Sequence, residues 1–185
     1  MTLSTEQGFP HWLMVGTFLR GWALAAQGQE ADGIAQMQQA VAARRSAGAE
    51  LARSFWLPLL AEAYGSMEQA EEGLSLMAEA LDVVVTTGER WYEAELHRLR
   101  GELLQHAAGH EAEAEACLHQ AIAVARRQQA SSLELRAAMS LSRLWQRQGK
   151  RAAARQLLAE VYDWFTEGFD TPDLQDARAL LNALA

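Results

Sequence analysis

The segment AEEGLSLMAEALDVVV (residues 70–85) indicates a helical protein, because its apolar residues fall on one side of a helix. Leu74, Met77, Leu81 and Val84 are spaced by three and four residues, the spacing of one α-helical face. Gly88 follows, and glycine readily takes the left-handed backbone conformation that closes a helix. The segment therefore predicts an amphipathic helix that ends near Gly88.

Small and apolar residues recur along the chain with a period close to 40. Four series share the period: Gly8, Gly48, Gly88 and Ala130; Gly21, Ala61, Gly101 and Leu141; Met37, Met77, Leu118 and Leu158; Ala40, Ala80, Ala121 and Val161. A fixed period of this length indicates a protein built from repeated supersecondary units.

Each period also contains another amphipathic run, such as YEAELHRLRGELL (residues 92–104). This run comes earlier in the period than the run of the 70–85 type. Breaks between the two runs are predicted at Gly28, Gly65, Gly109 and Gly149, which makes each period a helix–turn–helix unit. The recurring Gly and Ala residues are expected where the two helices of a unit approach closely.

This arrangement resembles the tetratricopeptide repeat (TPR). In the second unit the motif's Trp, Leu, Gly, Tyr, Phe and Ala positions hold Leu57, Leu60, Ala61, Tyr64, Met77 and Ala80. The period exceeds the usual 34 or so residues, the terminal proline is missing, and Arg20 and Arg100 stand where Leu is expected. Those arginines either lay their stems on apolar neighbours or hold an acidic partner.

The predicted fold is all-α, a right-handed TPR-like α-solenoid of about four units with a C-terminal capping helix. One domain, 1–185, comprises the end of a truncated upstream repeat (1–8), repeats 9–48, 49–88, 89–130 and 131–168, and the capping helix 171–185. Thr171 suits the N-cap and Pro172 the first position of that helix. Its expected buried stripe is Leu174, Ala177, Leu181 and Leu184.

Pro58 conflicts with the helix predicted from about Leu51, because a proline inside a helix removes one hydrogen bond and clashes with the preceding turn. The helix either kinks at Pro58 or begins at Leu57. We favour the kink, since a start at Leu57 would leave Phe55 and Trp56 in a loop.

Bulk properties exclude several partners. A net charge of −8 disfavours nucleic acid and anionic membranes, which reward clustered Lys and Arg. The single cysteine, Cys117, rules out an internal disulfide and suits the cytosol. Neither a signal peptide nor a run of roughly 18 apolar residues is present, so we expect a cytoplasmic protein.

No pattern of catalytic or metal-binding residues stands out. His106, His110, Cys117 and His119 lack the spacing of a zinc site, and Gly149–Arg151 lacks the flanking residues of a phosphate loop. No nucleophile can be matched with a base. We expect no cofactor, no metal and no catalysis within these residues.

The expected function is binding of a protein or peptide on the concave face formed by the first helices. The candidate contact residues are Phe18, Trp22, Phe55, Glu62, Glu95, Arg98, Glu102, Ser142 and Trp145. Such a surface, aromatic at one end and acidic in the middle, would suit a partner with apolar and basic anchors. The alternatives are packing roles for the tryptophans and, for the whole chain, a structural spacer or a self-associating homodimer.

A more specific resemblance rests on four segments: EQGFPHWLMVGTFLRGWALAAQGQ (6–29), LAEAYG (60–65), TGERWYEAELHRLRGELL (87–104) and the stretch from SLELRAAMSLSRLW to DARALL (132–181). They are similar to the C-terminal repeat region of bacterial multidomain signalling proteins, in which a class III adenylate/guanylate cyclase or another module precedes a signalling ATPase. No cyclase aspartates and no phosphate loop lie in this chain, so neither activity carries over. The resemblance implies a sensor or scaffold arm that also contacts upstream domains of its own protein.

Overall fold

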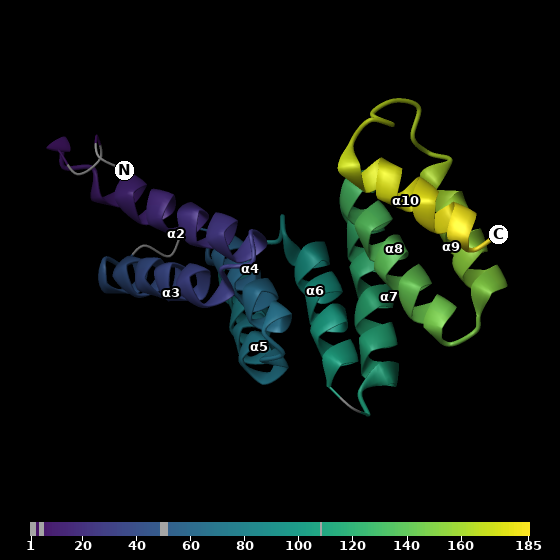
Figure 1. The fold of residues 1–185 in the computed structure, drawn as a ribbon, viewed down its shortest axis with the longest axis horizontal. Helices are drawn as coiled ribbons and strands as arrows, with labels where there is room; N and C mark the ends of the chain where they lie inside the picture. Colours follow the sequence, from purple (N-terminus) through teal and green to yellow (C-terminus); the bar gives the residue numbers. More distant parts are fainter. Residues whose placement is uncertain (1–2, 4–5, 49–51, 108) are drawn as a thin grey trace. The chain divides into compact units, whose positions relative to one another are not determined.

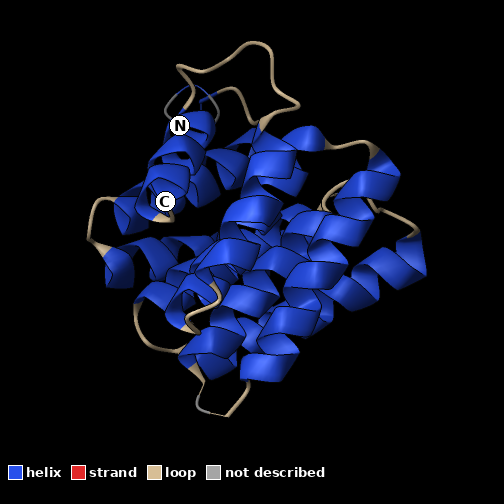
Figure 2. Cartoon of the chain, turned by 90° about the vertical axis from the view of Figure 1, so that its right-hand side faces the viewer, coloured by secondary structure: helices blue, strands red, loops and turns tan. Residues whose placement is uncertain are grey.

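The computed structural model describes residue 3 and residues 6–48, 52–107 and 109–185. Within these ranges the chain forms α-helices joined by short turns and contains no strand, which confirms the all-α prediction (Figure 2). Contacts between Cα atoms divide the chain into two compact units, unit 1 (Met1–Arg90) and unit 2 (Trp91–Ala185). In each unit the helices pair into antiparallel hairpins (Figure 1).

Unit 1 is built from two helical hairpins. Its helices are α2 (Pro10–Ala26), α3 (Glu30–Ser46), α4 (Arg53–Ser66) and α5 (Ala70–Thr87). Helix α2 packs on α3 and α4 packs on α5, while α4 also contacts both helices of the first hairpin. This is the helix–turn–helix pattern that the 40-residue period predicts.

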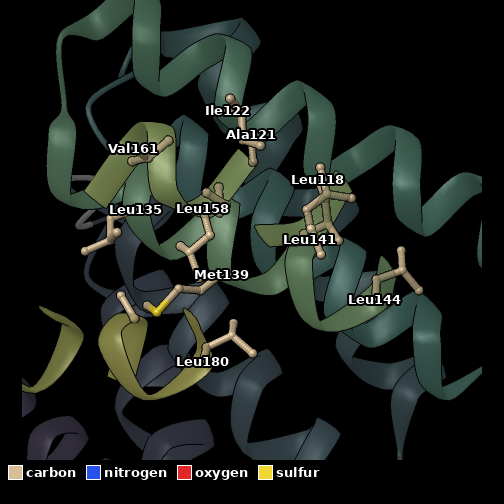
Figure 3. Close-up of a cluster of buried hydrophobic side chains, with 14 of the residues drawn as sticks. Leu118, Ala121, Ile122, Leu135, Met139, Leu141, Leu144, Leu158, Val161 and Leu180 are labelled. Carbon is tan, nitrogen blue, oxygen red and sulfur yellow. The ribbon is translucent and has the colours of Figure 1, made fainter. Parts of the chain in front are cut away.

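Unit 2 contains two more hairpins and a final helix. Its helices are α6 (Glu93–His106), α7 (Glu111–Gln128), α8 (Ser131–Arg147), α9 (Arg151–Tyr162) and α10 (Pro172–Ala183). Helix α8 contacts α6, α7, α9 and α10, so it lies at the centre of the unit. Its apolar residues share one core with α7, α9 and α10, including Leu118, Leu141 and Leu158 (Figure 3).

Glycines hold the paired helices at close distance. A Cβ atom added to Gly21 would lie 2.6 Å from the carbonyl oxygen of Gly33, and one added to Gly33 would lie 2.5 Å from the carbonyl oxygen of Gly21. In unit 2 a Cβ on Gly101 would lie 2.8 Å from Cγ of Leu118. The close approach predicted at Gly21 and Gly101 is therefore confirmed, and Gly33 completes the first contact.

Many of the described helices end close to a glycine, whereas α7 is capped by Gln129, which has φ of 56°. Gly88 has φ of 74° and closes α5, as predicted. The predicted break at Gly65 is wrong, because α4 continues to Ser66 and Glu68 takes the left-handed conformation in the turn, with φ of 61°.

Pro58 lies inside α4, which begins at Arg53. The amide of Trp56 donates to the carbonyl of Ala52 at 3.1 Å, so the turn before Pro58 is helical. This excludes a helix start at Leu57. The expected start at Leu51 lies outside the described residues, and the kink itself stays a prediction.

Helix α10 covers the end of unit 2 by packing on α8 and α9. Leu174, Ala177 and Leu184 are buried as predicted, Leu181 is partly buried, and Leu180 joins them. Thr171 holds the N-cap position, but its hydroxyl donates back to the carbonyl of Gly168 at 2.7 Å and makes no cap bond.

Replacing Ala80 with leucine is expected to lower the free energy of unfolding by about 1–3 kcal/mol through overpacking. Ala80 is 0% exposed on α5, where α5 packs on α4. Ala78→Leu is the matched control, because Ala78 is exposed on the same helix. Urea denaturation measures both variants, and equal midpoints for the two would contradict the packing assigned to Ala80.

Candidate functional site

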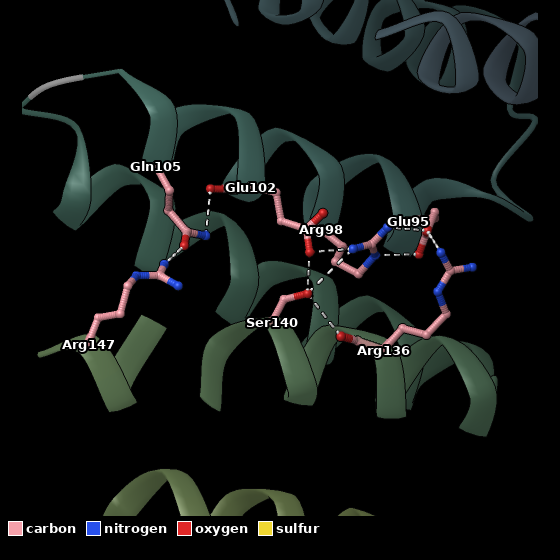
Figure 4. A network of polar contacts seen from close by, with 8 residues as sticks. Glu95, Arg98, Glu102, Gln105, Arg136, Ser140 and Arg147 are labelled. Carbon is pink, nitrogen blue, oxygen red and sulfur yellow. Dashed lines mark hydrogen bonds and ion pairs between the residues drawn. The ribbon is translucent and has the colours of Figure 1, made fainter. Parts of the chain in front are cut away.

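A buried ion-pair network joins α6 to α8 in unit 2. The Glu95 carboxylate is 1% exposed and accepts hydrogen bonds from Nε and Nη2 of Arg98 at 2.9 and 2.7 Å (Figure 4). Arg136 of α8 reaches the same carboxylate, with Nη2 at 2.8 Å. Two guanidinium groups therefore offset one buried negative charge.

The network continues along α6 to Glu102. Nη1 of Arg98 lies 2.5 Å from Oε1 of Glu102, and the hydroxyl of Ser140 donates to the same oxygen at 2.6 Å. The Glu102 side chain is 36% exposed, whereas Ser140 is 3% exposed. The buried end of the network fixes the two helices, and its Glu102 end reaches the surface.

A groove of 420 Å³ opens beside this end of the network. It lies between α6 and α8 and is lined by Glu102, Gln105, His106, Ser140, Arg143 and Arg147. Arg147 donates a hydrogen bond to Oε1 of Gln105 (Figure 4). Among the described residues neither Arg143 nor Arg147 forms an ion pair, and both are exposed. Since Glu102 is already paired with Arg98, the exposed charge of the groove is positive.

The structure brings together three of the predicted contact residues, Glu95, Arg98 and Glu102. Glu95 and Arg98 are buried, at 1% and 6% exposure, so only Glu102, at 36% exposure, is left of the acidic surface expected on α6. The sequence spacing correctly put these residues on one face of the helix. The negative charge of that face is offset by Arg98 of α6 and Arg136 of α8. Glu95 is therefore not exposed as the partner contact that the sequence predicts.

Two further candidates on α8 contact neighbouring helices. Ser142 is fully buried, and its hydroxyl donates to the carbonyl of Ala154 in α9 at 3.0 Å. Trp145 is half-buried, and its indole Nε1 donates to Oε1 of Glu115 in α7 at 2.7 Å. Ser142 is thus removed from any partner surface, and Trp145 is in large part a packing residue.

The remaining candidates belong to unit 1. Phe18 is 0% exposed and packs edge-on against Trp56 with ring centroids 4.9 Å apart, so it is a core residue and not a surface contact. Phe55 is half-buried, and its ring centroid lies 5.1 Å from that of Trp56. Trp22 and Glu62 are exposed.

Sequence reasoning missed the α8 side of the groove. Arg136, Ser140, Arg143 and Arg147 stand at i, i+4, i+7 and i+11, which is one face of a helix. That polar stripe was the available signal.

A larger groove, of 670 Å³, lies in unit 1 between the second helices α3 and α5, with Leu60 and Tyr64 of α4 among its lining residues. Its charged lining includes Arg45, which pairs with Glu79 at 2.5 Å. Burial raises the pKa of Glu79, but hydrogen bonds from Arg45 and Arg53 outweigh it and hold that pKa below its ordinary value. The charge of Arg45 is thus already offset, unlike those of Arg143 and Arg147.

Acidification is expected to destabilise unit 2 through His97 of α6. Burial lowers the pKa of His97 below 6.5; Glu93 opposes this, and Arg100 and Arg127 add to it. The unfolded chain therefore binds a proton at His97 more readily than the folded chain does. The contribution of His97 to stability is complete above the pKa of His97 in the unfolded chain, and it is lost as the pH falls through the pKa of His97 in the folded chain. Urea denaturation at about pH 7.5 and about pH 5.5 should show the loss. His97→Gln should reduce it, and an unchanged pH dependence in that variant would refute the assignment.

Two negative findings apply to the described ranges. No three His, Cys, Asp or Glu side chains there gather in a way that could hold a metal ion. No helix there is long and apolar enough to cross a membrane.

Comparison with known proteins places the fold. No family model and no curated protein matches the chain. A solved structure of nearly identical TPR-like repeats, assigned to a kinesin light chain of Podosopora anserina, superposes with a TM-score of 0.70 at 21% identity, covering 92% of this chain and 84% of that chain. A single-substitution variant of it gives 0.71 at 20% identity, with the same coverage. At this identity the likeness concerns the fold alone: the chain is an all-helical protein of TPR-like repeats.

Proposed function

We propose that the chain is a protein–protein interaction module that binds a peptide segment or partner domain. The binding face is formed by the first helix of each helix–turn–helix unit. In unit 2 this face is the groove between α6 and α8. The observation that carries the proposal is the pair of exposed cations, Arg143 and Arg147, beside a buried network that fixes both walls of the groove. Helical repeats present extended surfaces of this kind to their ligands.

The chemistry of the groove favours an anionic partner segment. Guanidinium groups bind carboxylates through paired, charge-assisted hydrogen bonds. Glu102 does not repel such a ligand strongly, because Arg98 and Ser140 already engage its carboxylate. We therefore assign the groove a segment rich in Asp and Glu. Within unit 1, Phe55 and Glu62 stay proposed partner contacts.

We further propose that this module is the sensor or scaffold arm of a larger bacterial signalling protein. The support is the resemblance of residues 6–29, 60–65, 87–104 and 132–181 to such repeat regions. In that setting repeats 9–48, 49–88, 89–130 and 131–168 would transmit partner binding to ATPase or cyclase domains, and the arm itself would not be catalytic. The single cysteine supports a cytoplasmic location.

Peptide display tests the proposal directly. Random peptides selected on the 185-residue chain should be enriched in Asp and Glu. For a selected peptide, Arg143→Glu/Arg147→Glu should raise the dissociation constant at least about thirtyfold, because interfacial cations become anions. Arg155→Glu is the control, since Arg155 is exposed on the second helix α9. Enrichment of basic peptides, or equal losses in Arg155→Glu, would contradict the proposal.

A further inference from the structure

Helix α2 carries two apolar faces, and unit 1 uses only one of them. Phe18 and Gly21 are buried against neighbouring helices. The other face presents Trp12, Val15, Leu19 and Trp22, with Trp12, Leu19 and Trp22 at 62%, 43% and 42% exposure and Val15 half-buried. Their spacing of three, four and three residues is the a/d pattern of helices that pack along a common seam.

The surroundings of this seam (Trp12, Val15, Leu19 and Trp22) permit a close partner. Gly16 and Ala23 flank it, and small residues let two helix backbones approach. The ionisable side chains of α2 are His11 and Arg20, whereas the whole chain has a net charge of −8. Two copies of an acidic protein therefore meet little like-charge repulsion at this face.

The order of residues in the seam is self-complementary. Trp12 and Trp22 lie at equal distances from residue 17, and so do Val15 and Leu19. If two copies of α2 pair antiparallel about that point, Trp12 meets the partner's Trp22 and Val15 meets the partner's Leu19. This is the reciprocal contact that a two-fold axis requires.

We propose that the chain forms a homodimer through antiparallel pairing of α2 with a second copy. The seam exposes on the order of 300 Å² of apolar surface per copy, against about 800 Å² per partner in a standard interface. The dimer is therefore weak and depends on concentration. It uses none of the residues of the α6–α8 groove, so it stands or falls independently of the proposed peptide binding.

Sedimentation velocity of the 185-residue chain at increasing concentration tests this dimer. The weight-average sedimentation coefficient should increase as the protein concentration is raised from about 1 µM to about 200 µM, a range that suits the weak association of a small interface. Trp12→Glu and Trp22→Glu should each raise the dimer dissociation constant at least about tenfold. The control is Trp164→Glu, because Trp164 is 79% exposed in unit 2, and it should change that constant less than about twofold.

A monomer throughout this range would overturn the proposal, as would equal losses in the Trp164→Glu control. Circular dichroism of each variant checks that helix content is retained, so that a loss of dimer is not a loss of fold.

Paired charges test the orientation. Trp12→Lys/Trp22→Glu places opposite charges across an antiparallel seam, and Trp12→Glu/Trp22→Glu places like charges there. The first double variant should dimerise at least about tenfold more tightly than the second. In a parallel pair, like charges would face each other in both double variants. Equal affinities of the two variants would therefore overturn the antiparallel arrangement.

Discussion

Phe18→Ala is expected to lower the free energy of unfolding of unit 1 by about 3–5 kcal/mol. The ring is fully buried in a cluster with Ile34, Met37 and Ala40 of α3, and its edge-on contact with Trp56 links α2 to α4. Truncation removes the transfer free energy of the ring and leaves a cavity that the two glycine-packed helices cannot close. Urea denaturation followed by tryptophan fluorescence measures the change.

Phe55→Ala is the matched control for Phe18, since Phe55 is half-buried beside the same indole. Phe55→Ala should lower the free energy of unfolding by about 1–2 kcal/mol, because the side chain of Phe55 buries less area than that of Phe18. If Phe18→Ala instead unfolds like the parent chain and changes only the binding of a partner, Phe18 is a surface contact and the packing described for unit 1 is wrong.

Glu95→Ala is expected to lower the free energy of unfolding of unit 2 by about 3 kcal/mol. The substitution leaves Arg98, which is 6% exposed, without its buried carboxylate, while Arg136 can turn to solvent. The value lies at the lower end for a broken buried pair because Arg98 keeps Glu102. Thermal or urea unfolding gives the change.

Glu102→Ala provides the comparison, because Glu102 is 36% exposed and its loss should cost about 1 kcal/mol or less. Replacing the buried pair together, as Glu95→Leu/Arg98→Met, should recover most of the stability, since it leaves no buried charge unpaired. Equal effects of Glu95→Ala and Glu102→Ala would show that burial of the network does not govern its energetics.

The helical fold was predictable because its constraints are periodic. Gly21 and Gly101 recur at a fixed spacing, and the structure places both where two helices touch. Ala40, Ala80 and Ala121 share that period and are each at most 2% exposed. Residues that must be small for a repeated geometric reason leave a repeated signal in the sequence.

The candidate site was predictable only in part, because spacing gives the face of a helix and not what covers that face. Glu95, Arg98 and Glu102 stand at i, i+3 and i+7, so their mutual pairing on α6 was accessible. The burial of Glu95 depends on Arg136, which α8 brings from elsewhere in the sequence. Phe18 was predicted as a surface contact for the same reason, because the residues that bury it belong to α3 and α4.

A crystal structure of the 185-residue chain bound to a peptide from the display selection would show which helices hold the peptide. We expect the peptide to lie between α6 and α8, with a carboxylate oxygen within hydrogen-bond distance of Arg143 or Arg147. A peptide seated instead on the second helices, such as in the groove between α3 and α5, would contradict this expectation.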